Sequence, residues 1–315
     1  MDKISVVLAT YNGEKYILDQ LESIYRQRRK PDEVIIRDDC STDRTCDLIE
    51  SFISTNKLKW KLIKGDSNIG FINNFTEALK SVTGDIIFLC DQDDIWKENK
   101  IYEMTSIMSK HHQILCLNSS YECIDSIGKK IPVNTFPFTS NNGLIIGKII
   151  KKNTVCSVKL EDITKYNISM GCTMALKKSL LKDYMNNAGY ALHDWLINIL
   201  AARNDGLFFY NKPLINYRIH SNNTIGQDDE FIPEKVKRIE MYSNNIAYFE
   251  AFLKCNYGEN DIRVKKELSK SLFFYRLRKK ILLDERISID EVLQAALTLK
   301  IRNIFLVRDL LIKVK

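Results

Sequence analysis

Residues 4–90 alternate between short apolar segments and longer segments with helical periodicity. The strand-like segments are residues 4–9, 32–37, 60–64 and 85–90. The segments with helical spacing are residues 14–27, 43–55 and 70–82. Strands that alternate with helices form parallel, doubly wound sheets, because each helix carries the chain back across the sheet. We therefore expect an α/β fold in which a mostly parallel, Rossmann-like sheet is flanked by helices.

Polar residues follow each of these strands directly. The strand ends carry Thr10-Tyr11-Asn12-Gly13, Asp38-Asp39-Cys40-Ser41, Asn68-Ile69-Gly70 and Asp91-Gln92-Asp93-Asp94. In an open parallel sheet, ligands bind outside the carboxyl ends of the strands. The pattern therefore predicts one pocket for a nucleotide, its phosphates and a cation.

Three carboxylates follow the fourth strand within four residues: Asp91, Asp93 and Asp94. Like charges so close repel one another, and a divalent cation is the usual remedy. Mg²⁺ suits such a site because it takes few protein ligands, and Mn²⁺ accepts the same oxygen ligands. The alternative is that Asp91 or Asp93 caps a helix running through Trp96 and Lys100. That alternative explains one aspartate but not three.

Composition narrows the class of protein. Hydrophobic residues make up 45% and charged residues 28%, a balance typical of soluble proteins. The sequence has neither an apolar stretch of the ~20 residues that a membrane span needs nor a recognisable signal peptide. The 8 cysteines form no CxxC pair or zinc spacing. These features predict a cytoplasmic protein with reduced thiols.

The second half of the chain is less regular. We expect strands at residues 115–121, 168–176, 207–210 and 214–218. We expect helices at residues 178–186 and 194–203 and from residue 233 onward.

The net charge of +7 is concentrated at the C-terminus, where residues 261–315 hold 14 Lys and Arg against 7 Asp and Glu. A basic tail on a neutral body indicates an anionic surface as partner, not a nucleic acid. The C-terminal helices either lie on an anionic membrane at its inner face or pack as a bundle with a solvated basic side.

The strand-end motifs together resemble those of family 2 glycosyltransferases of the GT-A fold. The segments that carry the resemblance are Ser5 to Asn12, Asp38 to Asp43, Asn68 to Gly70, Gly84-Asp85 and Asp91 to Asp94. The resemblance covers residues 3–225. It implies a catalytic domain at 1–230, divided into a nucleotide-binding half at 1–114 and an acceptor-binding half at 115–230. A basic helical extension follows at 231–315.

Three segments further resemble bacterial rhamnosyltransferases of surface-polysaccharide assembly: Asp91 to Trp96, His193-Asp194-Trp195 and Tyr217 to Asn223. This resemblance implies inverting transfer of L-rhamnose from dTDP-rhamnose to a saccharide linked to undecaprenyl diphosphate, in O-antigen or capsule assembly. The alternatives are a UDP-sugar transferase for GlcNAc, Gal or Glc, or a non-catalytic nucleotide-sugar-binding relic. A nucleotidyltransferase would need a Gly-rich basic loop after the first strand, which Thr10 to Glu14 lacks.

The resemblance also implies roles for individual residues. The donor-binding set is Thr10, Tyr11, Asn12, Glu14, Asp38, Asp39, Asn68, Gly70, Asp91 and Gln92. Within it, Asp39 accepts a hydrogen bond from the pyrimidine N3–H, which favours uracil or thymine over cytosine. The alternative interpretation of Tyr11 is an aromatic side chain packed in the core. The metal ligands are Asp93 and Asp91, with His220 either a further ligand or a structural residue.

Asp194 is the expected general base, which takes the proton of the acceptor hydroxyl as that oxygen attacks C1 of the sugar. The metal stabilises the departing diphosphate. The alternative interpretation is that Asp194 caps the helix that follows it. His193 is expected to contact the acceptor or to orient Asp194.

The remaining candidates for the acceptor and sugar are Trp96, Gly171, Cys172 and Trp195. Both tryptophans either stack on sugar rings or pack in the core. One departure from the family pattern is Cys40, which stands where the family usually has Gly. We expect that a small side chain suffices there and that positive φ is not required.

Overall fold

The computed structural model describes residues 2–132, 151–164, 167, 170–189, 192–220, 233–255 and 260–291. The chain forms two compact units. The first comprises residues 1–163 and 167–225, and the second comprises residues 164–166 and 226–315. The expected boundary at residue 230, Ser221 to Asn223 of the rhamnosyltransferase-like motif, and the basic segment after residue 291 lie outside the described residues.

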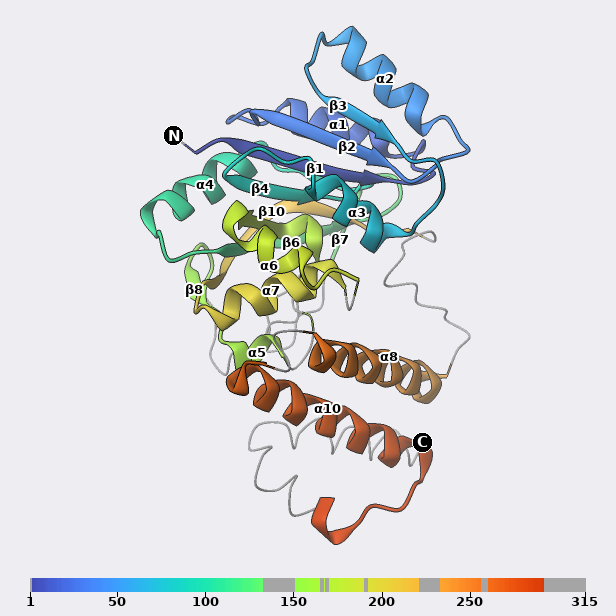
Figure 1. Ribbon diagram of the computed structural model, residues 1–315. Helices are drawn as coiled ribbons and strands as arrows, with labels where there is room; N and C mark the ends of the chain where they lie inside the picture. Colours follow the sequence, from blue (N-terminus) through green and yellow to red (C-terminus); the bar gives the residue numbers. More distant parts are fainter. Residues whose placement is uncertain are drawn as a thin grey trace. The chain divides into compact units, whose positions relative to one another are not determined.

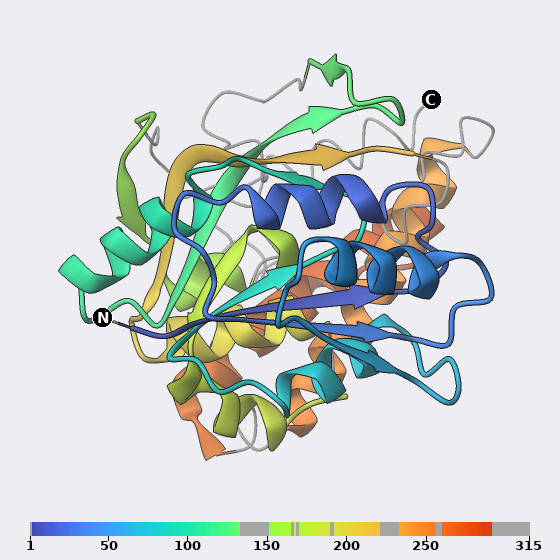
Figure 2. The ribbon, with the colours of Figure 1, turned by 90° about the horizontal axis from the view of Figure 1, so that it is seen from above.

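The first unit is built on a 10-stranded sheet with the order β3-β2-β1-β4-β9-β6-β10-β5. Its strands are β1 (Ile4–Thr10), β2 (Glu33–Asp38), β3 (Lys61–Lys64), β4 (Ile86–Cys90), β5 (Ile95–Trp96), β6 (Cys116–Ile124), β9 (Met174–Lys177) and β10 (Leu207–Arg218), with β7 (Lys130–Ile131) beside β6 and β8 (Val155–Ser157) beside β10. Strands β1 to β4 are parallel to one another, β6 is parallel to β10, and β9 is antiparallel to β4 and β6. In Figure 2, β1, β2 and β10 point toward the same edge of the sheet.

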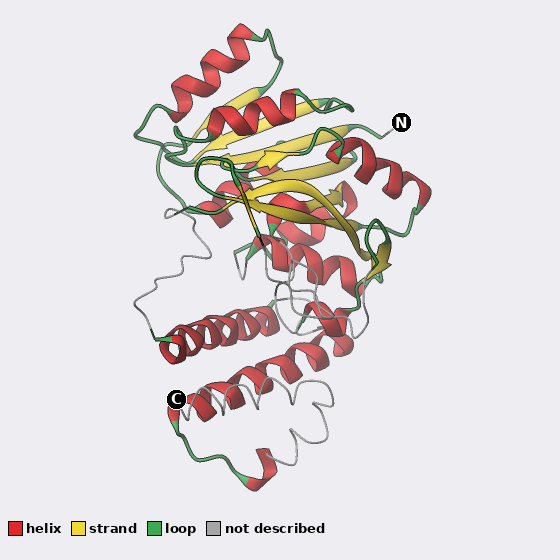
Figure 3. Cartoon of the chain, turned by 180° about the vertical axis from the view of Figure 1, so that it is seen from behind, coloured by secondary structure: helices red, strands yellow, loops and turns green. Residues whose placement is uncertain are grey.

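Helices cover both faces of the sheet (Figures 1 and 3). They are α1 (Ile17–Tyr25), α2 (Thr45–Thr55), α3 (Phe71–Leu79), α4 (Lys100–Lys110), α5 (Leu160–Ile163), α6 (Leu181–Met185) and α7 (His193–Arg203), with 3₁₀ turns η1 (Gly171–Thr173) and η2 (Lys178–Leu180). All seven residues of β1 are buried, since alternate side chains point to opposite faces and helices lie on both. Val6 and Leu8 pack in one core with Ile17, Leu21 and Ile49 of α1 and α2. The expected mixed α/β architecture is confirmed.

One expectation about local structure is wrong, and one alternative is removed. Residues 207–218 form one strand, not two, and its register against β6 shifts around Pro213. Pro213 has no N–H to donate, so the irregularity lets the strand continue past it. The interpretation of Asp91 or Asp93 as a helix cap also fails, because Ile95 and Trp96 form β5 and α4 begins only at Lys100.

The expected strand at residues 168–176 is shorter: Gly171–Thr173 form η1, and β9 begins at Met174. Ile168 and Ser169 lie outside the described residues.

The second unit contains the long helices α8 (Glu234–Lys254) and α10 (Ile262–Leu283). They pack through aromatic side chains, with the ring of Tyr275 5.6 Å from that of Tyr242 and 5.5 Å from that of Phe249. The carboxylate of Asp261 caps α10 by accepting hydrogen bonds from the backbone N–H groups of Arg263 and Val264. Across the described ranges, no helix is both long enough and apolar enough to cross a membrane.

Candidate active site

The parallel direction of β1, β2, β4 and β10 brings their carboxyl ends to one edge of the sheet. Because β9 is antiparallel to β4, the η1 turn that precedes it lies at the same edge. Most of the predicted site residues therefore come together there, as the polar strand ends indicate.

Gln92 joins the loop after β4 to the end of β1. Its amide accepts a hydrogen bond from the backbone N–H of Tyr11 and donates one to the carbonyl of Tyr11, each 2.9 Å long. Gly13 makes room for this side chain, since a Cβ there would lie 2.2 Å from Oε1 of Gln92. The Tyr11 side chain is 44% exposed, so the alternative of a core aromatic is wrong.

Asn12 and Glu14 hold the loop before α2. Asn12 has positive φ, and its side-chain oxygen accepts a 2.9 Å hydrogen bond from the N–H of Thr42. Glu14 accepts a 3.0 Å hydrogen bond from the N–H of Arg44. Both side chains thus shape the pocket wall through the loop that they fix.

Asp38 and Asp39 are both buried and point to different partners. Asp38 accepts hydrogen bonds from the hydroxyl of Thr10 (2.8 Å) and the N–H of Ser41 (2.7 Å). Asp39 accepts from the N–H groups of Ile69 (3.0 Å) and Gly70 (2.8 Å). Asp39 is therefore the carboxylate that faces the start of α3.

The turn before α3 depends on Gly70, whose φ is 82°. The side-chain oxygen of Asn68 accepts a 3.1 Å hydrogen bond from the N–H of Gly70. A φ in this range favours glycine because other residues crowd their own backbone there.

Cys40 also takes positive φ, at 65°, so the expectation that a small side chain removes this requirement is wrong. The turn after β2 needs left-handed backbone whatever residue stands there, and Cys40 adopts it at some cost.

Asn74 was missed by the sequence analysis. It is buried in α3, and its side-chain NH₂ donates to the carbonyls of Arg37 (3.0 Å) and Thr10 (3.3 Å). Its oxygen accepts from the Arg37 guanidinium at 2.5 Å. Asn74 thus ties the ends of β1 and β2 together. The available signal was an amide directly before Phe75 on the apolar side of a helix.

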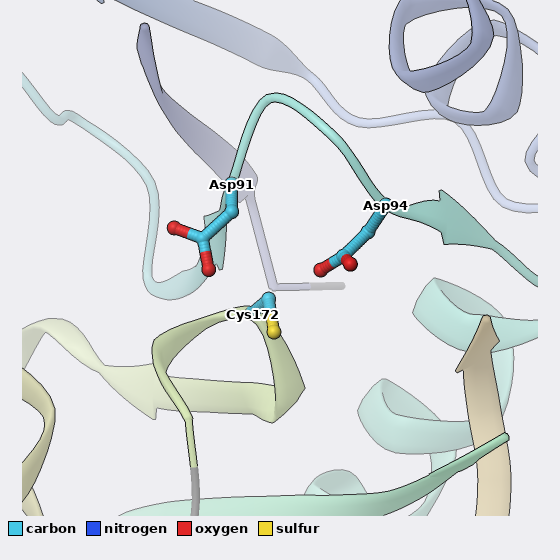
Figure 4. A group of neighbouring side chains, drawn as sticks. All are labelled: Asp91, Asp94 and Cys172. Atoms are coloured by element: carbon cyan, nitrogen blue, oxygen red, sulfur yellow. The ribbon is translucent and has the colours of Figure 1, made fainter. Parts of the chain in front are cut away.

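Asp91, Asp94 and Cys172 lie close together (Figure 4), with ligand atoms that all lie within 4.8 Å of one another. Asp94 is fully buried; its Oδ1 accepts a 3.0 Å hydrogen bond from the N–H of Arg218. Burial, followed by the charges of Asp93 and then Asp194, raises the pKa of Asp91 to about 7. Burial, followed by the Asp93 charge, also raises the pKa of Asp94.

Asp93 and His220 meet across the same loop. Nε2 of His220 lies 3.0 Å from Oδ2 of Asp93, and the imidazole packs on the Tyr16 ring with 4.7 Å between centroids. The structure therefore brings together the two residues that the sequence placed 127 positions apart as metal ligands.

Arg218 is the second residue missed. Its buried guanidinium donates to the carbonyl of Asp93 (2.8 Å) and to the carboxylate of Asp19 (2.8 Å), and it lies 4.6 Å above the Tyr16 ring. A further 3.3 Å hydrogen bond reaches the carbonyl of Ser126. Residues 91–94, between β4 and β5, form the acidic loop. Arg218 thus fixes the acidic loop against α1 and the turn after β6. Its signal was its place two residues before His220.

Lys100 is the third residue missed. It is fully buried, its ammonium donates to the carbonyl of Cys172, and it lies 3.8 Å above the Trp96 ring. Burial lowers the pKa of Lys100 to about 8. Nothing in the sequence around Lys100 marks a buried lysine.

Asp194 lies in the first turn of α7, where the helix dipole favours a negative charge. The cap position belongs to Leu192, so the interpretation of Asp194 as the N-cap is wrong. Its carboxylate accepts hydrogen bonds from the amide of Asn167 (3.0 Å) and from the N–H of Trp195 (2.7 Å). Its neighbour His193 lies against Gly171 of η1, and the sulfur of Cys172, the next residue of η1, lies within 4.8 Å of a carboxylate oxygen of Asp91. Asp194 therefore lies near the loop after β4.

Residues 5–183, more than half of the chain, match the family model described as glycosyl transferase family 2. The chain belongs to this family.

Two relatives illustrate its range. The dTDP-rhamnosyl transferase RfbG of Shigella flexneri is 28% identical over 297 residues, covering 87% of this chain and 94% of that protein. The poly(ribitol-phosphate) beta-N-acetylglucosaminyltransferase TarS of Staphylococcus aureus is 33% identical over 120 residues, covering 37% of this chain and 21% of that protein.

Solved glycosyltransferase structures share the fold. TarS 1–349 in complex with UDP-GlcNAc aligns with a TM-score of 0.60 at 20% identity over 99% of this chain and 82% of that chain. The mannosyltransferase PcManGT from Pyrobaculum calidifontis, in complex with GDP-Man and Mn²⁺, aligns with a TM-score of 0.56 at 18% identity over 99% and 86%. The GT-A fold is thereby confirmed, and the nucleotidyltransferase alternative is removed.

Four acceptor candidates of this glycosyltransferase take structural positions instead. Trp96 and Trp195 are 2% and 1% exposed, so they pack in the core and offer no ring face to a sugar. The indole N–H of Trp195 donates to the carbonyl of Ile163 at 2.8 Å. Cys172 is fully buried, and its sulfur lies within 4.8 Å of carboxylate oxygens of Asp91 and Asp94. Gly171 lies against the imidazole of His193, because a Cβ there would be 2.9 Å from Nε2.

His193 is also buried, and its ring stacks on Phe75 with 4.4 Å between centroids. Burial lowers its pKa, although the nearby charge of Asp194 acts in the opposite direction. Within the described residues neither ring nitrogen has a hydrogen-bond partner, so His193 does not orient Asp194 through a hydrogen bond.

The loop after β4 suits a divalent cation. The carboxylates of Asp91, Asp93 and Asp94 are close enough to raise the pKa of Asp91 and Asp94, and a cation would relieve that repulsion. Mg²⁺ and Mn²⁺ prefer oxygen ligands, and Mn²⁺ also accepts imidazole. Asp91, Asp93 and His220 therefore fit such an ion, whereas the buried thiol of Cys172 does not.

Proposed function

We propose that this family 2 glycosyltransferase moves L-rhamnose from dTDP-rhamnose to a saccharide acceptor with inversion, using a divalent cation. The observation that carries the proposal is the closeness of Asp194 to the acidic loop: its neighbour His193 lies against Gly171 of η1, and Cys172 of η1 has its sulfur within 4.8 Å of a carboxylate oxygen of Asp91. A base that must act beside a departing diphosphate needs this placement.

The choice of sugar rests on the relative RfbG, named as a dTDP-rhamnosyl transferase, because the match covers 94% of that protein. The second candidate is a UDP-sugar such as UDP-GlcNAc, which the shorter match to TarS supports. Asp39, at the end of β2, favours thymine or uracil because both carry an N3–H donor.

In this mechanism Asp194 accepts the proton of the acceptor hydroxyl while that oxygen attacks C1 of the sugar. The N–H of Trp195 and the amide of Asn167 hold the carboxylate in place. Asp91, Asp93 and His220 would hold the cation. When bound, the cation supplies Lewis-acid stabilisation of the departing diphosphate. A single displacement of this kind inverts the anomeric centre.

The acceptor would be linked to undecaprenyl diphosphate, and α10 would meet the anionic membrane that holds it. Arg263, Lys265 and Lys266 are exposed near the start of α10, beside the exposed apolar side chain of Ile262. Basic and apolar side chains in this arrangement favour anionic lipid surfaces. Reversing the charge of Lys265 and Lys266 in the full chain should reduce co-flotation with phosphatidylglycerol vesicles; unchanged flotation would remove this part of the proposal.

The test of the function is donor turnover by the purified chain with dTDP-rhamnose, UDP-GlcNAc, UDP-Glc and GDP-mannose, in EDTA and after addition of Mg²⁺ or Mn²⁺. We expect metal-dependent release of dTDP and thermal stabilisation by dTDP-rhamnose. Turnover of UDP-GlcNAc alone would favour the second candidate, and stabilisation by GDP-mannose alone would contradict the pyrimidine assignment. Binding of a donor without any turnover would leave a nucleotide-sugar-binding relic.

A further inference from the structure

Two side chains of the acidic loop, Asp91 and Asp94, converge with Cys172, which lies far along the chain in η1. Asp91 follows β4, Asp94 precedes β5, and Cys172 lies in η1. Their carboxylate oxygens and sulfur all lie within 4.8 Å of one another (Figure 4). The set is distinct from the pair formed by Asp93 and His220, because Cys172 adds a soft ligand and Asp94 is held in the interior.

Asp94 has unused bonding capacity in this cluster. Its Oδ1 accepts the N–H of Arg218, but its buried Oδ2 has no N–H or O–H donor in the described part of the chain, and the donor beside this carboxylate is the weak thiol of Cys172. Figure 4 shows the Asp94 carboxylate directed toward the space between Asp91 and Cys172. A buried carboxylate oxygen without an N–H or O–H donor is costly, so this one calls for a bound group.

Thiolate and carboxylate ligands together select zinc-like cations rather than magnesium. We propose that Asp91, Asp94 and Cys172 form a binding site for a thiophilic divalent cation such as Zn²⁺. A water molecule completes four-coordination, and the thiol proton passes to solvent when the sulfur binds. Lys100 places one positive charge nearby, but the neighbouring carboxylates outnumber it. Asp91 is only half-buried and gives the ion a route from the surface.

This site shares Asp91 with the one that would hold Mg²⁺ or Mn²⁺. An ion at Cys172 therefore withdraws a ligand from the catalytic cation, and Zn²⁺ acts as an inhibitor of transfer. The inhibition depends on the proposed function, whereas the binding does not. A failure of zinc binding and a failure of glycosyl transfer are therefore measured separately.

The binding experiment is a titration of the full chain with Cd²⁺, followed by the ultraviolet charge-transfer band of cadmium thiolate. We expect one tight equivalent in the parent chain and none in Cys172→Ser. Asp94→Asn keeps an oxygen for the N–H of Arg218 and should bind Cd²⁺ at least about tenfold more weakly. Cys255→Ser removes a buried cysteine of the second unit and should retain the tight equivalent.

An unchanged band in Cys172→Ser would assign cadmium binding to other cysteines and overturn the proposal. Turnover with Mn²⁺ is then measured with increasing Zn²⁺, each variant relative to its own uninhibited rate. Cys172→Ser should need at least about tenfold more Zn²⁺ for the same fractional inhibition. Equal sensitivity would mean that zinc competes at Asp93 and His220, which would also overturn the proposal.

Discussion

Nε2 of His220 lies 3.0 Å from Oδ2 of Asp93, so the residues after β10 complete a site that begins after β4. An imidazole and a carboxylate at this separation can share one cation. We expect Asp93→Asn and His220→Gln each to weaken Mn²⁺ binding by about 10- to 100-fold. Electron paramagnetic resonance of free Mn²⁺ measures this directly. Asp85→Asn, at the opposite end of β4, is the matched control and should bind Mn²⁺ like the parent chain.

Arg218 positions the acidic loop, so its conservative replacement should affect stability and metal binding together. Arg218→Lys keeps one charge but cannot reach Asp93, Asp19 and Ser126 at once. We expect a loss of about 2 to 3 kcal/mol in the free energy of unfolding, with weaker Mn²⁺ binding. Arg26→Lys alters only an exposed pair with Glu22 and should change neither quantity. Parent-like Mn²⁺ affinity in Arg218→Lys would limit Arg218 to a structural role.

Asp194 should be needed for chemistry and not for donor binding. Asp194→Asn keeps the shape and the hydrogen-bonding oxygen but cannot accept the acceptor proton at neutral pH. We expect kcat to fall by about 10² to 10⁴ while the Kd for dTDP stays nearly constant. Asp205→Asn, just past the other end of α7, is the control. A matching loss of dTDP affinity in Asp194→Asn would contradict its assignment as base.

Glycine at position 40 should stabilise the protein, because Cys40 has a φ of 65°. The change to glycine relieves the strain of left-handed backbone, but it also makes the unfolded chain more flexible, which lowers stability. Because the first effect is larger, we expect the free energy of unfolding of Cys40→Gly to rise by about 0.5 to 1 kcal/mol. Cys46→Gly, inside α2, should instead cost about 1 kcal/mol. Urea unfolding of both variants gives the comparison. Destabilisation by both changes would show that the Cys40 side chain contributes contacts that outweigh its strain.

Glu33 stands at the start of β2, at the edge of the sheet opposite the site. Its contribution to the free energy of unfolding should depend on pH. Burial acts to raise the pKa of Glu33, but hydrogen bonds from Ser5 and Thr83 outweigh it and lower the pKa below 4.5. A lowered carboxyl pKa stabilises the fold above the unfolded pKa, and this contribution disappears as pH falls through the folded value. Glu33→Gln should therefore cost about 1 kcal/mol at neutral pH and progressively less below about pH 4.5. A loss of stability in Glu33→Gln that does not change with pH would mean that the charge of the Glu33 carboxylate does not stabilise the fold.

The sequence predicts this fold well because its signals are local. Apolar segments followed by polar residues mark the ends of β1, β2 and β4, and parallel strands must bring those ends together. The family resemblance paired Asp93 with His220, and the structure places their side chains 3.0 Å apart. The sequence predicts Arg218, Lys100 and Asn74 poorly because their partners lie far away along the chain.

One choice that the sequence left open and one error have distinct physical causes. Trp96 and Trp195 had two possible uses, stacking on a sugar or packing in the core, because tryptophan serves both, and only burial separates them. Cys40 was expected to avoid positive φ, but the path of the chain after β2 sets the backbone angle there regardless of the residue.

The contact between Arg218 and Asp93 spans 125 residues and sets an order of assembly in time. During synthesis the ribosome releases the aspartates of the acidic loop long before β10, and the hydrogen bonds from the Arg218 guanidinium to Asp93 and Asp19 cannot form until β10 arrives. The nascent chain therefore cannot present a finished cation site until nearly all of the first unit has been made. A chain that stops before residue 207 would have every strand-end motif of the nucleotide half and still lack the residues that lock its acidic loop in place.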